Sequence, residues 1–184
     1  MSGEVIPMAL RLSSIIPVLA ALAGGCSPSF EASLPDVEIT QHGLVMAGAP
    51  GLPQPGGATV TSSFTISSSI AAWAKRMNSK VFVHQVTVTA SGGLPNLDFI
   101  ESALVTATAP SISESTTEIA NYARSVGAQS SSSIEGTRPA PIDVTRLWSA
   151  DQMVISLQAT GQLPEQDWIV DVTLKFSGDI TYDF

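Results

Sequence analysis

The last part of the chain shows the clearest alternation of apolar and polar residues. Apolar side chains stand at every second position, at Trp168, Val170, Val172, Leu174 and Phe176. The positions between them carry Asp171, Thr173, Lys175 and Ser177. Because successive side chains of a strand point to opposite faces, this pattern predicts a strand with one face in a core and one in water. The alternation stays in phase past Gly178 to Phe184, which predicts a bulge at Gly178 within one long strand.

Similar alternation recurs upstream and predicts further short strands. The apolar positions that carry it are Val60, Phe64 and Ile66, then Phe82, Val86, Val88 and Ala90, then Met153, Ile155, Leu157 and Ala159. Further strand candidates, in which the alternation is less regular, cover residues 36–40, 99–107 and 142–147. Residues 44–58 and 127–141, rich in Gly, Pro, Ser and Ala, are predicted to be long loops. The pattern as a whole predicts an all-β fold, an antiparallel β-sandwich of roughly seven or eight strands, immunoglobulin-like in architecture.

Two stretches have helical spacing instead. Ile70, Trp73, Ala74 and Met77 follow two serines that suit a helix N-terminus. Ile119, Tyr122, Ala123 and Val126 follow Ser115-Thr116-Thr117-Glu118, which has the spacing of a capping box. One or two short helical turns are therefore expected beside the sheets.

A motif of the form G-x-L-P-x-x-D-aromatic occurs twice, at residues 92–99 and 161–168. The strand positions in front of it align at the same offset, Val86 with Ile155 and Val88 with Leu157. This repeated loop motif predicts two strand-loop-strand units of matching geometry, in which the Asp bonds loop amides and the aromatic residue re-enters the core. A pair of equivalent binding loops is one interpretation. A loop that simply joins antiparallel strands well is the favoured alternative.

The first 25 residues have the order of a secretory signal peptide. Arg11 precedes an apolar stretch over residues 15–22, which is much shorter than the roughly 20 residues that cross a bilayer. The segment Leu22-Ala23-Gly24-Gly25-Cys26 follows, and Cys26 is the only cysteine. It resembles the lipobox of bacterial lipoproteins, which implies cleavage before Cys26 and acyl chains on that cysteine. A plain secretory peptide that leaves an unpaired thiol is the alternative, and translation from either Met1 or Met8 is left open.

Together with the strand pattern, the resemblance leads us to expect three parts of the chain. Residues 1–25 form the lipoprotein signal peptide, residues 26–35 the lipidated N-terminus and tether, and residues 36–184 a single β-sandwich domain, for which the length suffices. Ser27 rather than Asp follows the cysteine. In lipoproteins of bacteria with two membranes, that residue implies the outer membrane.

The formal net charge is −8, and no run of basic residues occurs. This composition argues against nucleic-acid binding and against electrostatic docking on anionic lipids. Attachment to the membrane is therefore expected through the acyl chains.

Residues for catalysis are few. No G-x-S-x-G motif occurs, and His42 and His84 are the only histidines. His84 shares the alternation of Val86 and Val88, so it either faces the core or is shifted outward by a bulge at His84-Gln85, whereas His42 is expected to be exposed. A small envelope serine hydrolase that uses His84 or His42 is one alternative function.

Residues that could bind a metal, a cofactor or a sugar are equally few. The chain lacks the regular His and Cys spacing of transition-metal sites, and no cofactor motif is present. Asp98, Asp179 and Asp183 would be the ligands of a calcium-dependent adhesion module, the second alternative. Trp73, Trp148 and Trp168 would form a sugar platform if two were exposed together. We expect Trp168 to be buried, and Trp148, the best candidate for exposure, to have a core or edge role.

These observations favour a lipid-anchored cell-envelope protein with a non-enzymatic structural or binding role. Its partner would be an envelope protein or a glycan, reached from the membrane to which the acyl chains attach it. The sequence leaves the oligomeric state open.

Overall fold

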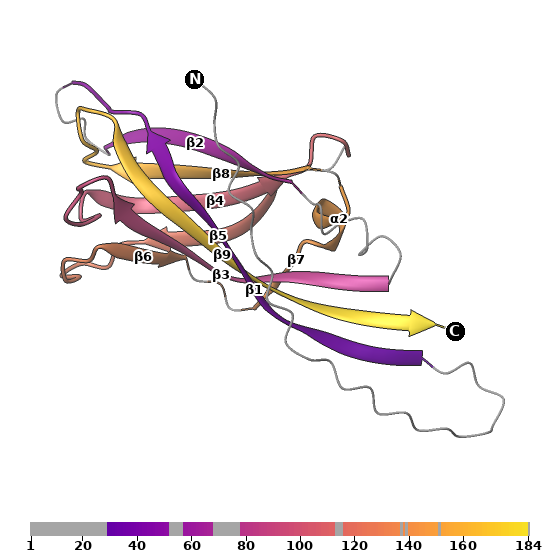
Figure 1. The fold of residues 1–184 in the computed structure, drawn as a ribbon. Helices are drawn as coiled ribbons and strands as arrows, with labels where there is room; N and C mark the ends of the chain where they lie inside the picture. The colour runs from indigo at the N-terminus through magenta and orange to yellow at the C-terminus, as the bar shows by residue number, and fades with distance from the viewer. Residues whose placement is uncertain are drawn as a thin grey trace, which may run out of the picture.

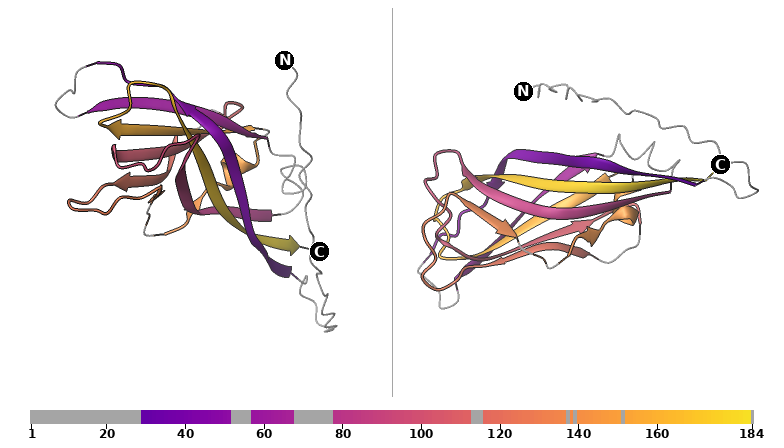
Figure 2. Two further views of the ribbon diagram at one scale, coloured as in Figure 1. Left: turned by 60° about the vertical axis from the view of Figure 1, so that its left-hand side comes forward. Right: turned by 90° about the horizontal axis from the view of Figure 1, so that it is seen from below.

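The computed structural model describes residues 29–51, 57–67, 78–112, 116–136, 138, 140–150 and 152–183. The predicted signal peptide, the acylation site Cys26 and the helix predicted over residues 70–77 lie outside these ranges. The described residues form two sheets that face each other (Figures 1 and 2).

Both sheets are antiparallel. Sheet A has the order β1 (Ser29–Met46), β9 (Trp168–Asp183), β3 (Asn78–Ser91) and β6 (Ser133–Gly136), and the short β7 (Ile142–Asp143) also pairs with β3. Sheet B has the order β2 (Ala58–Ser67), β8 (Gln152–Gly161), β4 (Ile100–Thr108) and β5 (Thr117–Ala123). A short helix, α2 (Thr145–Trp148), precedes β8. This arrangement confirms the predicted antiparallel β-sandwich.

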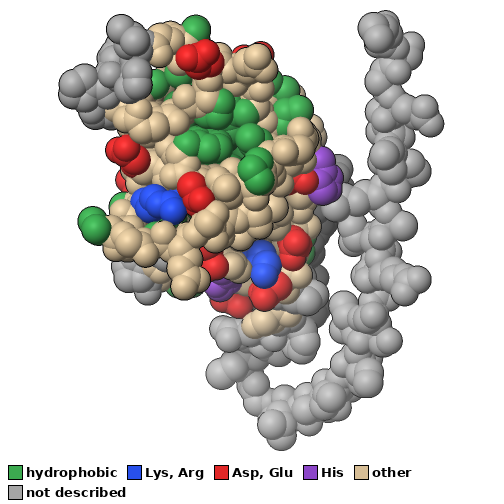
Figure 3. Space-filling view, turned by 90° about the vertical axis from the view of Figure 1, so that its left-hand side faces the viewer, with side chains coloured by type: hydrophobic (Ala, Val, Ile, Leu, Met, Phe, Trp, Pro, Cys, Tyr) green, Lys and Arg blue, Asp and Glu red, His purple; other side chains and the backbone are tan. Residues whose placement is uncertain are grey.

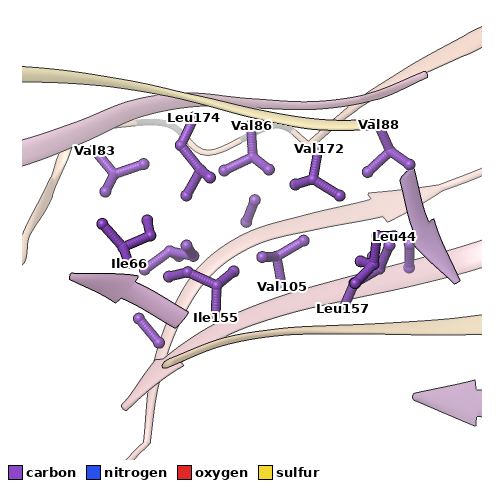
Figure 4. Close-up of a cluster of buried hydrophobic side chains, with 14 of the residues drawn as sticks. Leu44, Ile66, Val83, Val86, Val88, Val105, Ile155, Leu157, Val172 and Leu174 are labelled. Carbon is purple, nitrogen blue, oxygen red and sulfur yellow. The ribbon is translucent and has the colours of Figure 1, made fainter. Parts of the chain in front are cut away.

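The core lies between the sheets, where the inward-facing side chains of both meet (Figure 4). Val170, Val172 and Leu174 of β9 have no exposed surface, while the residues between them are partly exposed. Met153, Ile155, Leu157 and Ala159 of β8 are buried in the same alternating way. The period-two pattern in the sequence therefore identified the core faces of β8 and β9.

β9 is one long strand, as predicted, but the bulge is not at Gly178. Pairing between β9 and β3 is regular there, with Val81 opposite Gly178. The register shift lies on β1 instead, between Leu34 and Val37. β1 also begins at Ser29, so residues 29–35, which the sequence placed in the tether, belong to a strand.

The helix predicted from Ile119 to Val126 is wrong, because Thr117–Ala123 form strand β5. A register shift opposite Val105 and Thr106 inserts Ile119 as an extra residue in β5. As a result the adjacent residues Ile119 and Ala120 are both buried. The apolar residues of this segment therefore do not alternate strictly, and their spacing resembles that of a helix. Pairing with β4 outweighs the weak local preference of the segment.

Two further predictions need correction. Residues 142–147 are not one strand, since the two-residue β7 is followed by α2. The loop predicted over residues 127–141 contains β6, whose Ile134 is buried against the core.

Sheet A is longer than sheet B. β1, β9 and β3 continue beyond the last pair of β2 and β8, Ser67 with Gln152, as a three-stranded projection (Figures 1 and 2). α2 covers the inner face of sheet A where the projection begins, with Trp148 against Phe176 at a ring-centroid distance of 4.8 Å. Among the described residues, no helix has the length and apolar content that spanning a membrane requires.

Candidate functional site

Four loops meet at the end of the sandwich opposite the projection, which we call the loop end. They join β1 to β2, β3 to β4, β5 to β6 and β8 to β9. The residues of these loops that the structure describes are 47–51 and 57, 92–99, 124–132 and 162–167. The strand pairs that border them are Met46–Trp168, Ala58–Gly161, Ile100–Gly161, Ser91–Ile169 and Ser102–Ala123. Figure 3 shows the molecule from this side.

The repeated loop motif supplies two of these loops, and each crosses from one sheet to the other. Residues 92–99 lead from β3 in sheet A to β4 in sheet B, and residues 162–167 lead from β8 in sheet B to β9 in sheet A. The two strands that each copy of the motif joins therefore lie in different sheets and do not pair with each other. The aromatic residues do re-enter the core as predicted: Phe99 and Trp168 pack edge to face, with ring centroids 5.0 Å apart at 84°.

Asp167, from the second copy of the motif, holds the first residues of the loop between β1 and β2. Its Oδ1 accepts a hydrogen bond of 2.9 Å from the backbone N–H of Gly48. The backbone N–H of Ala49 donates to the carbonyl of Pro164 at 2.9 Å. A Cβ at Gly48 would lie 2.3 Å from the carbonyl oxygen of Glu165, so the two loops are in direct backbone contact.

Asp98, from the first copy, fixes the loop between β5 and β6. Its Oδ1 accepts from the Arg124 guanidinium at 3.0 Å and from the backbone N–H of Ser131 at 3.2 Å. The Ser130 hydroxyl, the Ser131 amide and Arg124 lower the pKa of Asp98, the hydroxyl having the largest effect. The predicted role of the motif Asp, bonding loop amides, is thus seen in both copies, although the amides belong to the neighbouring loop.

The exposed surface of the loop end mixes apolar and acidic groups. Val126, at the tip of the loop between β5 and β6, is fully exposed, and Glu165 and Asp167 are exposed in the loop between β8 and β9. Figure 3 shows hydrophobic side chains gathered in one area of this end, with acidic side chains around it. Such a surface offers apolar contact together with carboxylates for hydrogen bonds to cationic or N–H donors.

A recess between β3, β4, β5 and β6 is too small for an organic ligand. Its volume of about 10 Å³ has room for about one water molecule. Its lining residues are Val86, Val88, Ala103, Val105, Ala120, Asn121, Tyr122, Ile134 and Gly136.

His84 is exposed, as the bulge alternative predicted. The register of β3 with β9 shifts between Val83 and Gln85, which turns His84 out of the core. The same shift buries Val81 and Val83, so Phe82, assigned to the core face, lies half-buried on the other face. The imidazole of His84 is bonded to the Ser177 hydroxyl.

His42 is exposed too, at a register shift of β1 between Gln41 and Leu44. Its Nδ1 lies 2.8 Å from Oδ2 of Asp171, whose Oδ1 accepts from the Gly43 N–H at 2.8 Å. The Gly43 amide, with His42 second, lowers the pKa of Asp171.

In the described part of the chain, His42 is bonded to an acidic residue but to no serine, and His84 to a serine but to no acidic residue. The serine-histidine-acid site that the hydrolase alternative requires is not assembled by these residues.

The calcium alternative finds little support among the described residues, which include no group of three or more potential metal ligands. The carboxylate of Asp98 forms an ion pair with Arg124 and accepts a hydrogen bond from the Ser131 N–H. The carboxylate of Asp179 accepts a hydrogen bond from Ser33. The side chain of Asp183 lies outside the described part.

The tryptophans do not form an exposed platform where the structure describes them. Trp168 is only 3% exposed, which confirms its predicted burial, and Trp148 is only 6% exposed, so of the core and edge roles expected for it the core role holds. Trp73 lies outside the described ranges.

No protein-family model matches the chain, and no curated protein matches it either. One solved structure similar to it is described as "Structural basis for the promiscuous specificity of the carbohydrate-binding modules from the beta-sandwich super family". The sequences are 9% identical, the TM-score is 0.32, and the alignment covers 79% of this chain and 54% of that one. The chain thus spans about half the length of that structure.

Proposed function

We propose that this protein is a lipid-anchored cell-envelope protein that binds an envelope partner through its loop end, without catalysing a reaction. The observation that carries the proposal is the way in which Asp98 and Asp167 hold neighbouring loops together. Loops that are fixed to each other and to the core present a preorganised surface, which lowers the entropic cost of binding.

The N-terminal segment supports the anchor. Leu22-Ala23-Gly24-Gly25-Cys26 resembles a lipobox, and β1 begins at Ser29, at the end of the sandwich remote from the loop end. Acyl chains on Cys26 would therefore attach the molecule by one end and leave the loops at the other. If the source has two membranes, Ser27 favours the outer one.

A protein partner fits the loop end better than a glycan. Sugar-binding surfaces commonly stack exposed aromatic rings on the ligand, and the aromatic side chains that the structure describes are all buried or half-buried. The exposed Val126 and the carboxylates of Glu165 and Asp167 suit a protein surface with apolar and basic residues.

The anchor is tested by intact mass and detergent partitioning of the wild type and of Cys26→Ala after expression in a bacterium. We expect a chain that starts at Cys26, carries acyl chains and enters the detergent phase, and we expect the variant to lose both properties. A soluble wild type without acyl chains would contradict the anchor.

Binding at the loop end is tested with single cysteines in the native host, since an acylated Cys26 leaves no free thiol. Val126→Cys is at the tip of the loop end, and Gln152→Cys, exposed at the far end of β8, is the matched control. A thiol crosslinker should join Val126→Cys to one envelope component, and added unlabelled wild-type protein should compete. Equal crosslinking at both positions would contradict the proposal.

A further inference from the structure

Unpaired strand edges favour pairing with another strand, and sheet edges usually carry features that block it. β1 carries two register shifts together with the exposed Glu38 and His42. β6 has only four residues. β5 has a register shift and an ion pair between Glu118 and Arg138. β7, the other outer strand of sheet A, has only two residues. The described outer strands other than β2 are thus protected by bulges, charge or short length.

β2, the remaining outer strand, has none of these features. It runs for ten residues, Ala58–Ser67, and contains no charged residue and no proline. Its register with β8 is regular over its whole length. Among the described residues, β8 is the only strand that pairs with β2, so the other edge of β2 has no backbone partner there.

The apolar side chains along this edge are incompletely covered. Val60 and Phe64 point inward and contact the core, yet both are only half-buried. The inward-facing residues of the neighbouring β8 are at most 1% exposed. A further strand beside β2 would extend the core over Val60 and Phe64.

We propose that β2 pairs with β2 of a second copy of this chain, antiparallel and about a two-fold axis at Ser62. Residues opposite each other in an antiparallel pair lie on the same face. In this register Val60 faces Phe64 and Ala58 faces Ile66 on the inner side, while Thr59 faces Thr65 and Thr61 faces Ser63 on the outer side. Apolar residues thus face apolar residues, and residues with a hydroxyl face residues with a hydroxyl. Sheet B becomes continuous across the two copies.

The distribution of charge is compatible with a second copy of the chain beside β2. With a net charge of −8, two copies repel each other in general, but neither β2 nor β8 carries a charged residue. Hydroxyl pairs already bridge these strands at Thr59–Thr160, 2.9 Å, and Ser63–Ser156, 2.8 Å, and the proposed register adds further pairs of the same type. The loop ends of the two copies lie at opposite ends of the pair, so neither copy covers the loop end of the other. The N-termini are opposed in the same way, so acyl chains on both copies would hold the pair parallel to the membrane surface.

The first test is disulfide trapping of the full chain in the cell envelope. Opposed residues in an antiparallel pair have Cα atoms about 4.5 to 5.5 Å apart, within the range of a disulfide. Under mild oxidation Ser62→Cys should therefore form a covalent dimer. Thr65→Cys is more exposed but faces Thr59 of the second copy, so it should not, and the wild type controls for a bond through Cys26. No dimer at residue 62, or equal trapping at residue 65, would overturn the proposal.

The second test places a charge on the edge. Thr61 and Gln158 are opposite each other on the same outer face, Thr61 on β2 and Gln158 on β8. Thr61→Lys should raise the dimer dissociation constant at least about tenfold, because the two lysines lie near each other across the axis, and Gln158→Lys should leave it unchanged. Light scattering in detergent measures both, and thermal unfolding shows that both variants fold. A wild type that stays monomeric, or equal effects of the two lysines, would overturn the inference while leaving the binding role of the loop end untouched.

Discussion

The first glycine of the repeated loop motif is required in both copies, for different physical reasons. At Gly161 an added Cβ would lie 2.1 Å from the carbonyl oxygen of Phe99, so the backbones are too close for a side chain. Gly92 has a φ of +63°, a left-handed conformation that L residues with a side chain avoid. The second position differs as well, since Gly93 has a φ of +92° whereas Gln162 has no positive φ. The two copies thus share the role of the Asp but not the backbone of the turn.

We predict that Gly161→Ala destabilises the protein more than Gly93→Ala does. Gly93→Ala adds backbone strain of about 1 to 2 kcal/mol, because a Cβ there has nothing within 4 Å. Gly161→Ala adds a collision with the backbone at Phe99, and overpacking of this kind costs about 1 to 3 kcal/mol more. Urea unfolding of both variants measures the difference, and equal midpoints would show that the loop relaxes freely around residue 161.

Asp171 links the bulge of β1 to the outer face of β9, and we predict that its contribution to stability depends on pH. The hydrogen bonds from Gly43 and His42 lower its pKa in the folded state below the ordinary value of about 3.9. A lowered pKa means stabilisation that is present above this value and is lost as the pH falls through the folded-state pKa. Asp171→Asn should therefore reduce the free energy of unfolding at pH 7, and the deficit should shrink below about pH 4.

His42→Gln is the matched control for Asp171→Asn. It keeps the Gly43 amide, which has the largest effect on the pKa of Asp171, and removes only the imidazole. The loss of stability at pH 7 should be smaller than for Asp171→Asn. Chemical unfolding at several pH values measures both, and a deficit of Asp171→Asn that is constant with pH would contradict the assignment.

At the scale of single elements, alternation predicted the strands where pairing is regular and failed where a residue is inserted. β8 pairs with β2 over ten residues without a shift, and its buried positions are those that the sequence indicated. Shifts at His84 in β3 and at Ile119 in β5 change the phase within one strand. A one-residue insertion depends on the partner strand, which is distant in sequence, so local periodicity does not reveal its position.

A pair of variants distinguishes the strand β5 from the helix that its spacing suggests. As a strand, β5 buries Ala120 against Gly136, where a Cβ would lie 2.6 Å from that of Ala120, and it leaves Val126 fully exposed beyond its end. We expect Ala120→Leu to cost about 1 to 3 kcal/mol through overpacking. Val126→Ser should change stability by less than about 0.5 kcal/mol, as exposed positions usually do. Thermal or urea unfolding measures both, and the reverse order would support the helix.

At the scale of the whole molecule, the sequence predicted one of the two partners in each contact of Asp98 and Asp167 at the loop end. The repeated loop motif identified Asp98 and Asp167 as residues that bond loop amides, because the same spacing recurs after aligned strands. Their partners Gly48, Arg124 and Ser131 carry no signal of this kind. They are brought close only by sheet pairing between segments distant in sequence, and no local pattern encodes that arrangement.

The two aspartates hold different loops, so we predict that their effects on local opening are separable. Asp167→Ala removes the acceptor of the Gly48 amide, and Asp98→Ala that of the Ser131 amide. Amide hydrogen exchange should become at least about tenfold faster at Gly48 in the first variant and at Ser131 in the second, because a charged acceptor is lost in each. Each loop should keep its wild-type protection in the other variant, since separate contacts without shared partners act additively. Faster exchange in both loops of either variant would show instead that the edge-to-face contact of Phe99 and Trp168 makes the four loops open as one unit.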